Sequence, residues 1–211
     1  MRKTIDDYFD AIDAARSIRV RELSEIKRLF GTPSSTADPM GVQSKALVVL
    51  SYAAWEGFYN ECVDAYCDFL QTRGKKVSDA GWKMLVGALG AEFDSLRSRN
   101  HSPVAKRDFV EKLQTRLACD FADFDRKAVK ATSNLDWDKL DQNFQILDFD
   151  LARFQKYRNR LHKEVVGWRH GVAHGDAPNL GSLDASQHIS LVGEVMTLMA
   201  DVFQEAMLAH L

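Results

Sequence analysis

The stretch Ala46–Asn60, ALVVLSYAAWEGFYN, decides the fold class of this 211-residue chain. Its first half is rich in Leu and Val and would also suit a β-strand. The apolar pattern, however, runs on without a break to Leu70, which is too long for a strand, and Gly74 follows in the position of a glycine that ends a helix. We therefore predict a long helix that is apolar on several sides and lies at the centre of the fold.

Two further regions show helical spacing of their apolar residues. Between residues 5 and 30 an apolar residue recurs every three to four positions, and Thr4 and Asp7 form a capping box in front of them. Residues 104–177 contain no proline, which permits a second long helical region. In that region a stripe with steps of three and four residues consists of Leu151, Phe154, Arg158, Leu161, Val165, Trp168 and Val172.

The rest of the chain completes an all-α pattern. Gly175 ends the helix that carries the stripe, and Asp184 with Gln187 can cap a final helix. The middle, residues 78–146, contains only short helical patterns, one of them running from Trp82 to Phe93. We predict one domain over residues 1–211, a bundle of four to five long helices with short helices inserted between the second and the fourth.

Composition narrows the classes of function. The chain has 28 Lys and Arg against 30 Asp and Glu, and its net charge of −2 excludes a generally polycationic nucleic-acid binder. Three cysteines without a CxxC pair argue against a disulfide framework or a cysteine-rich zinc site and favour a reducing compartment. No apolar run approaches about 18 residues, and the first ten residues turn acidic. We expect a cytoplasmic protein that does not enter a membrane.

The region from Arg153 to His174 departs from this charge balance. It holds six basic residues and a single acidic one, Glu164, together with three of the six histidines of the chain. A helix this basic is typical of a surface that binds a phosphate-bearing partner. A solvated face balanced by acidic helices elsewhere is the alternative interpretation.

Within this region, Arg169 to His174 (RHGVAH) resembles the RxxxxH signature of the HEPN superfamily. The residue after the arginine is most often Asn in that signature and is His170 here. Residues 133–150, SNLDWDKLDQNFQILDFD, resemble the lead-in of the MAE-like stand-alone bacterial HEPN proteins, and residues 52–59, YAAWEGFY, resemble their second helix. The resemblance begins between residues 40 and 60. It leaves out residues 1–40, an N-terminal helix with a loop rich in Pro and Ser.

The resemblance implies a helical bundle and, in many members, a metal-independent endoribonuclease of a toxin–antitoxin or antiphage system. It also implies a homodimer with a composite cleft, no cofactor, and in many cases a neutralising antitoxin or defence partner. In this chemistry His174 moves the proton of an RNA 2′-OH or of the leaving oxygen, and Arg169 holds the phosphate. His170 would then orient the substrate or transfer a second proton.

Helical geometry sets a condition on this pair. On an ideal helix Arg169 and His174 lie ~140° apart and do not share a face. Gly171 and Gly175 could loosen the last turn, or a dimer could bring a second copy of each residue opposite the first.

Four more residues are candidates for RNA binding or for orienting the catalytic pair. Glu56 is the only charged residue between positions 46 and 60, and a carboxylate there needs a partner. We expect it to bond Arg169 or a motif histidine, with a structural pairing to Arg158 as the alternative. Arg158, His162 and Lys163 belong to the basic helix.

Other interpretations of the motif remain open. A HEPN module could bind RNA or a partner protein without catalysis, and the motif could also be a coincidence in a helical scaffold. His170 and His174 are four residues apart, a spacing that suits a divalent metal with Asp176 as a third ligand, and chelation would then lower activity or stability. We predict no metal.

Overall fold

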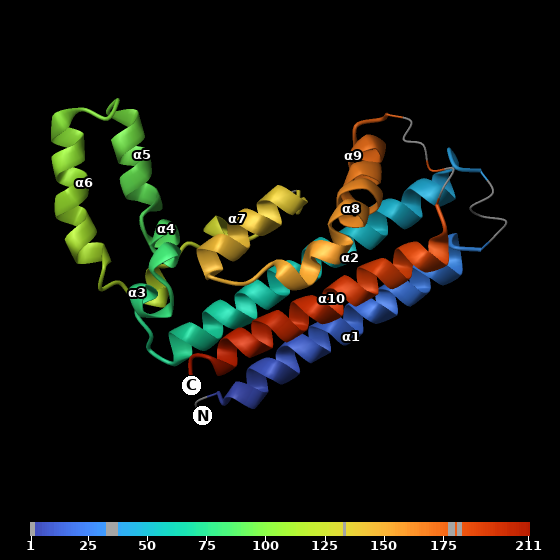
Figure 1. Ribbon diagram of the computed structural model, residues 1–211, viewed down its shortest axis with the longest axis horizontal. Coiled ribbons are helices and arrows are strands. Elements are labelled where there is room, and N and C mark those ends of the chain that lie inside the picture. Colours follow the sequence, from blue (N-terminus) through green and yellow to red (C-terminus); the bar gives the residue numbers. More distant parts are fainter. Residues whose placement is uncertain (1–2, 33–37, 133, 177–179, 181–182) are drawn as a thin grey trace.

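Figure 1 shows the computed structural model, which describes residues 3–32, 38–132, 134–176, 180 and 183–211. Within these ranges every regular element is a helix, and the one β-type pairing is an isolated bridge between Lys76 and Asp120. The predicted all-α fold is confirmed. None of the helices in these ranges is both long and apolar enough to cross a membrane.

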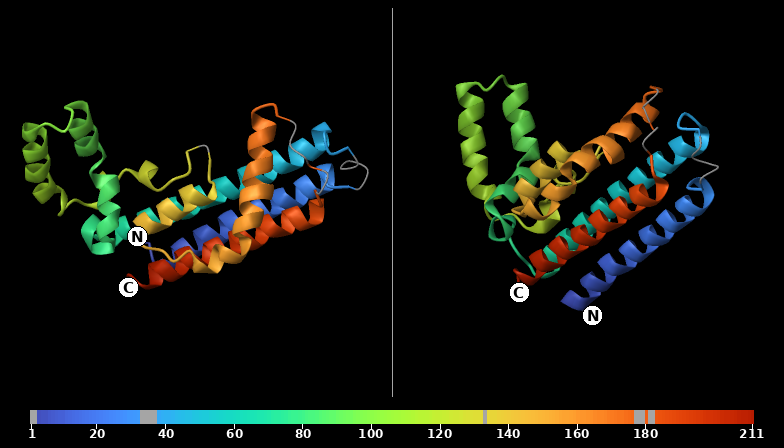
Figure 2. Two further views of the ribbon diagram at one scale, coloured as in Figure 1. Left: turned by 45° about the horizontal axis from the view of Figure 1, so that its top comes forward. Right: turned by 45° about the vertical axis from the view of Figure 1, so that its right-hand side comes forward.

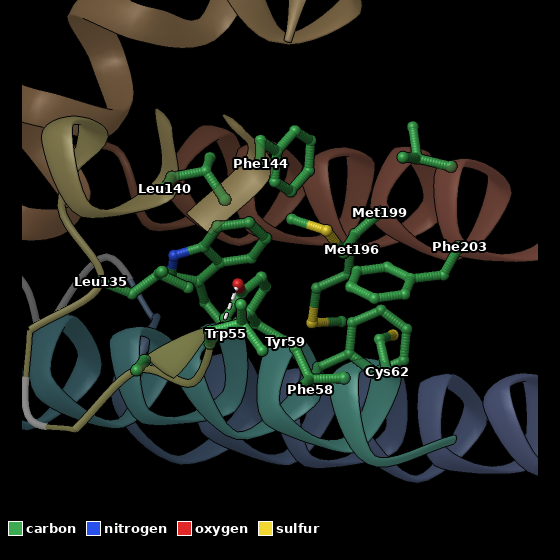
Figure 3. Packing of buried hydrophobic residues seen from close by; sticks show 14 of the residues in the cluster. Trp55, Phe58, Tyr59, Cys62, Leu135, Leu140, Phe144, Met196, Met199 and Phe203 are labelled. Carbon is green, nitrogen blue, oxygen red and sulfur yellow. Dashed lines mark hydrogen bonds between the residues drawn. The ribbon is translucent and has the colours of Figure 1, made fainter. Parts of the chain in front are cut away.

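Three long helices form the body of the molecule. They are α1 (Ile5–Phe30), α2 (Val42–Thr72) and α10 (Ala185–Leu208), and each packs against the other two (Figures 1 and 2). The region that could have been a strand lies inside α2, as its length predicts. Figure 3 shows the core between α2 and α10, where aromatic rings and methionines interleave. Its labelled residues are Trp55, Phe58, Tyr59, Cys62, Leu135, Leu140, Phe144, Met196, Met199 and Phe203.

Local signals fix the ends of these helices. The Thr4 side chain accepts a hydrogen bond from the Asp7 N–H, and the Asp7 carboxylate accepts one from the Thr4 N–H, so the capping box is confirmed. Asp184 accepts a hydrogen bond from the Gln187 N–H at 2.9 Å and caps α10. After α2, Gly74 takes a positive φ of 66°, which glycine adopts without steric cost.

The chain between α2 and the site is built from short helices. They are α3 (Val77–Ala80), η1 (Trp82–Met84), α4 (Leu85–Ala88), α5 (Gly90–Ser98), α6 (Pro103–Arg116), η2 (Phe121–Asp123), η3 (Arg126–Ala128) and α7 (Trp137–Leu147). The single helix expected from Trp82 to Phe93 is instead three pieces, which meet between Met84 and Leu85 and at Leu89. Helices α5 and α6 form a hairpin that projects from the bundle (Figures 1 and 2).

The fourth long helix is continuous but not regular. It consists of the 3₁₀ segment η4 (Ala152–Tyr157), α8 (Arg158–Arg160), the π-helical segment η5 (Leu161–Gly167) and α9 (Trp168–Ala173). A 3₁₀ turn is tighter than an α turn and a π turn is wider, so their effects on helical phase oppose each other. Phe154 in the 3₁₀ segment and Trp168 after the π segment are both buried, although the helix between them changes type twice.

Candidate active site

Helix α9 places Arg169 against the central helix α2. The guanidinium carbon of Arg169 lies 4.6 Å from the centre of the Tyr52 ring, a distance at which a cation is attracted to the face of an aromatic ring. The Arg169 side chain is half-buried, whereas Tyr52 is buried. The arginine of the motif is thus held in a defined position by an aromatic ring of the bundle.

Tyr52 is itself anchored from a third segment. Its hydroxyl accepts a hydrogen bond from the Leu135 N–H at 2.6 Å, just before helix α7. Burial raises the pKa of Tyr52 well above its usual range, and the neighbouring Glu56 carboxylate raises it further, while Arg169 opposes the shift. The phenol is therefore neutral at physiological pH, and Arg169 meets an uncharged ring.

A hollow of about 360 Å³ opens beside this pair. Arg169 and Glu56 both line it, and no other charged side chain does so in the described part of the chain. The remaining lining residues come from α2 and are Val49, Tyr52, Ala53, Gly57 and Asn60. The hollow pairs one cation with one carboxylate at the surface of the central helix.

His170 and His174 lie together at the C-terminal end of α9, and both are exposed. Their ring centres are 4.3 Å apart, and His174 caps the helix with its N–H bonded to the His170 carbonyl at 3.1 Å. Helix α9 is α-helical from Trp168 to Ala173, so Gly171 does not loosen it, and the chain turns away at Gly175, where φ is 76°. Within one protomer Arg169 and His174 consequently leave the helix on different sides.

The other basic candidates lie along the same irregular helix, outside the hollow. Arg158 is exposed, with its guanidinium carbon 5.4 Å from the centre of the Trp137 ring, and His162 and Lys163 are exposed on η5. Arg160 is paired with Glu164 at 2.9 Å. The structure thus places Glu56 and Arg169 on the same hollow, and it leaves Arg158, His162 and Lys163 on an exposed basic surface.

With this geometry in hand, the comparisons with known proteins give one match. The model of the family HEPN_MAE_28990, described as a HEPN domain of that type, matches residues 9–208. The chain belongs to this HEPN family. The match includes α1, which the residue patterns alone left outside the resemblance. A search of curated proteins and a search of solved structures each gave no match.

Tyr52 and Asn60 of this HEPN domain belong to the hollow but were not singled out in the sequence. The Asn60 side chain exchanges two hydrogen bonds with the main chain of Ala131, at 2.9 and 3.0 Å, and so fixes one wall. Together with Glu56 they repeat every four residues and share one face of α2. That spacing around the lone carboxylate is the signal that points to them.

Other chemical groups of the HEPN domain are less suited to catalysis. Burial raises the pKa of the Cys62, Cys67 and Cys119 thiols, which disfavours a reactive thiolate. Among the described residues, no group of three or more His, Cys, Asp or Glu side chains is placed to hold a metal ion. Asp176 does not complete such a group with His170 and His174.

Proposed function

We propose that this HEPN domain is a metal-independent endoribonuclease of a toxin or antiphage defence system, with its active site in a cleft shared by two protomers. The observation that carries the proposal is the Arg169 guanidinium, held on Tyr52 beside an open hollow, at the start of a motif whose histidines are exposed. Membership of a HEPN family supports an RNA substrate. The three cysteines are free, which agrees with a protein of the reducing cytoplasm.

The chemistry is transesterification of the RNA backbone. A neutral imidazole of His174 takes the proton of a 2′-OH, and the oxygen attacks the adjacent phosphorus. The bond from phosphorus to the 5′-oxygen breaks, a 2′,3′-cyclic phosphate forms, and an imidazolium protonates the leaving oxygen. His170, whose ring is 4.3 Å from that of His174, can supply this second proton. Arg169 holds the phosphate oxygens, on which negative charge increases in the transition state.

A second hollow, which is mainly apolar, is the surface through which we expect two protomers to meet. It has a volume of about 540 Å³ between α1 and α2 and shares Ala53 with the Arg169 hollow. Ile18 and Leu29 on its walls are about half exposed, at 54% and 50%, and both signs of charge occur at its edge through Arg21 and Glu25. Such a patch is typical of an interaction site, and mixed charges suit contact with a second copy of the same surface. A protomer seated there stands next to Arg169.

The test is cleavage of RNA by the wild-type protein and by His174→Ala in the presence of a chelator. We expect the substitution to abolish cleavage, with a thermal unfolding midpoint and an RNA affinity close to those of the wild type. His210→Ala is the control, because His210 lies at the far end of α10 and bonds the Tyr66 hydroxyl at 2.9 Å. This control should retain cleavage.

A non-catalytic HEPN module that binds RNA or a partner protein is the second candidate. The position of Arg169 and His174 on different sides of α9 favours it, as does His170 in place of the usual Asn. If the wild-type protein binds RNA and leaves tRNA, mRNA and rRNA intact, with or without a chelator, this candidate replaces the nuclease.

A further inference from the structure

The turn between α5 and α6 carries a concentration of positive charge far from the motif in sequence. Residues 97–107 hold four basic residues, no Asp and no Glu. All four basic side chains are exposed, and so is the histidine between them. These residues, which we call the hairpin tip, are Arg97, Arg99, His101, Lys106 and Arg107.

Carboxylates of α6 pair with only part of this charge. Asp108 bonds Arg99 at 2.8 Å and Arg107 at 3.2 Å. Arg97 and Lys106 have no carboxylate partner in the described ranges of the chain. At least two cations of the tip are thus free to meet an external anion.

The hairpin is braced, so the tip holds its charges in place. The buried Glu92 of α5 pairs with Arg116 of α6 at 3.0 Å, and the rings of Phe93 and Phe109 stack with their centres 5.6 Å apart. At the turn, Ser102 caps α6 by accepting a hydrogen bond from the Ala105 N–H at 3.2 Å. An anion bound there would meet a preformed surface with little ordering cost.

Positive charge is concentrated in two segments of the chain, and the rest of the chain is negative. Residues 73–116 contain ten basic and five acidic residues, and residues 151–176 contain six and two, which gives net charges of +5 and +4. The total is −2, so the remaining residues together carry −11. The α5–α6 hairpin and α9 rise from the same side of the bundle in each of the views (Figures 1 and 2). A polyanion on that side can reach both positive regions.

We propose that the hairpin tip is a second RNA-binding surface, which holds phosphates of a strand whose other part lies at Arg169 and His174. The choice of RNA as the polyanion rests on the proposed function. The free cations of the tip would be Arg97 and Lys106, and each would neutralise one phosphate. The domain would then bind an RNA that reaches both surfaces more tightly than a short one.

The experiment measures RNA binding by variants that also carry His174→Ala, because this substitution should prevent cleavage and keep the RNA intact. Arg97→Gln with Lys106→Gln removes the two free cations, and Lys27→Gln with Arg28→Gln makes the same charge change on exposed residues of α1, away from the hairpin. Each lost phosphate contact to single-stranded RNA lowers affinity about 5-fold at 0.1 M salt, so we expect about a 25-fold loss for the tip variant on a 30-nucleotide RNA. The slope of log affinity against log salt should become shallower by about 1.4.

The same variants are tested on a trinucleotide and on anionic lipid vesicles. The trinucleotide should bind both variants equally, and the vesicles should bind neither. If the tip variant binds the long RNA as tightly as the α1 variant does, the proposal is wrong even where the wild-type protein cleaves RNA. If cleavage is absent and the tip dependence remains, the nuclease fails and the binding surface stands. Binding to vesicles in place of RNA would assign the tip to a membrane surface and overturn the proposal.

Discussion

Tyr52 and Tyr59 lie seven residues apart on α2 and hold the same segment of chain, but in different surroundings. The Tyr52 hydroxyl accepts a hydrogen bond from the Leu135 N–H, and the Tyr59 hydroxyl donates one to the Val129 carbonyl, each at 2.6 Å. Both rings are buried. As anchors of the chain before α7 the two tyrosines are equivalent.

The two tyrosines differ in the residues that surround them. The Tyr59 hydroxyl also accepts a hydrogen bond from the Asn143 side chain at 2.8 Å, and its ring packs edge-on against the buried Phe203. Tyr52 instead supports the Arg169 guanidinium and borders a hollow with Glu56. Both tyrosines anchor the same segment of chain, but Tyr59 packs within the core, whereas Tyr52, two helical turns earlier, also holds a cation at the surface.

The largest effect is expected from removing the cation that Tyr52 holds and Tyr59 lacks, which is Arg169. Arg169→Ala should lower the rate of RNA cleavage about 10²–10³-fold, because a positioned donor to the developing charge is lost. Its stability should fall by only ~1–2 kcal/mol, the worth of a partly buried cation–π contact. Arg158→Ala is the matched control, since Arg158 lies over the Trp137 ring in the same way but outside the hollow. Equal loss of cleavage in both variants would contradict a special role for Arg169.

The second prediction concerns a buried group beneath the site. His188 of α10 stacks on Trp168, the neighbour of Arg169, with ring centres 5.8 Å apart. Neither of its ring nitrogens has a hydrogen-bond partner in the described residues, unlike the Tyr59 hydroxyl. Burial lowers the pKa of His188 to about 4 from 6.5. The folded protein therefore keeps His188 neutral where the unfolded chain protonates it.

Stability should consequently depend on pH below neutrality. The contribution of His188 is constant above pH ~7 and is lost as the pH falls from about 6.5 to about 4, because the unfolded state then binds the extra proton, at a total cost of about 3 kcal/mol. Urea unfolding of the wild type and of His188→Leu at pH 7.5, 6 and 5 measures the difference. The leucine variant should lose less stability on acidification, and parallel curves would show that His188 is not held neutral.

The sequence predicts the bundle better than it predicts the site. Long helices such as α2 carry their apolar period and their end signals locally, so periodicity is enough. The change from η4 to η5 leaves the steps of three and four residues intact, so the spacing alone does not reveal it. Arg169 and Glu56 stand out as a motif and as a lone charge. Tyr52 does not, because its role depends on Leu135, which is 83 residues away.

Substituting the two tyrosines sharpens the comparison further. Tyr52→Phe and Tyr59→Phe should each lower the free energy of unfolding by about 1–2 kcal/mol or more, since the first removes the buried hydrogen bond to Leu135 and the second removes those to Val129 and Asn143. Only Tyr52→Phe should also slow RNA cleavage, about threefold to tenfold, by loosening the ring under Arg169, because ~1 kcal/mol in a barrier corresponds to about a fivefold change in rate. Urea unfolding and single-turnover cleavage measure the two effects. If both variants cleave equally well, the anchor of Tyr52 is structural alone.

Glu56→Gln should have the smallest effect and the most specific signature. The carboxylate lines the same hollow as Arg169 and interacts with Tyr52, so its loss should strengthen binding of the RNA anion slightly and loosen the ring that holds the guanidinium. We expect KM and kcat both to fall about twofold to fivefold, with the free energy of unfolding unchanged, since ~0.4–1 kcal/mol separates such values.

Glu61→Gln is the control on the same helix, where the carboxylate pairs with Arg19 on α1 instead. A structural carboxylate would change stability and leave both kinetic constants alone. Unchanged cleavage with unchanged folding in Glu56→Gln would therefore remove Glu56 from the site and leave Arg169 to be positioned by Tyr52.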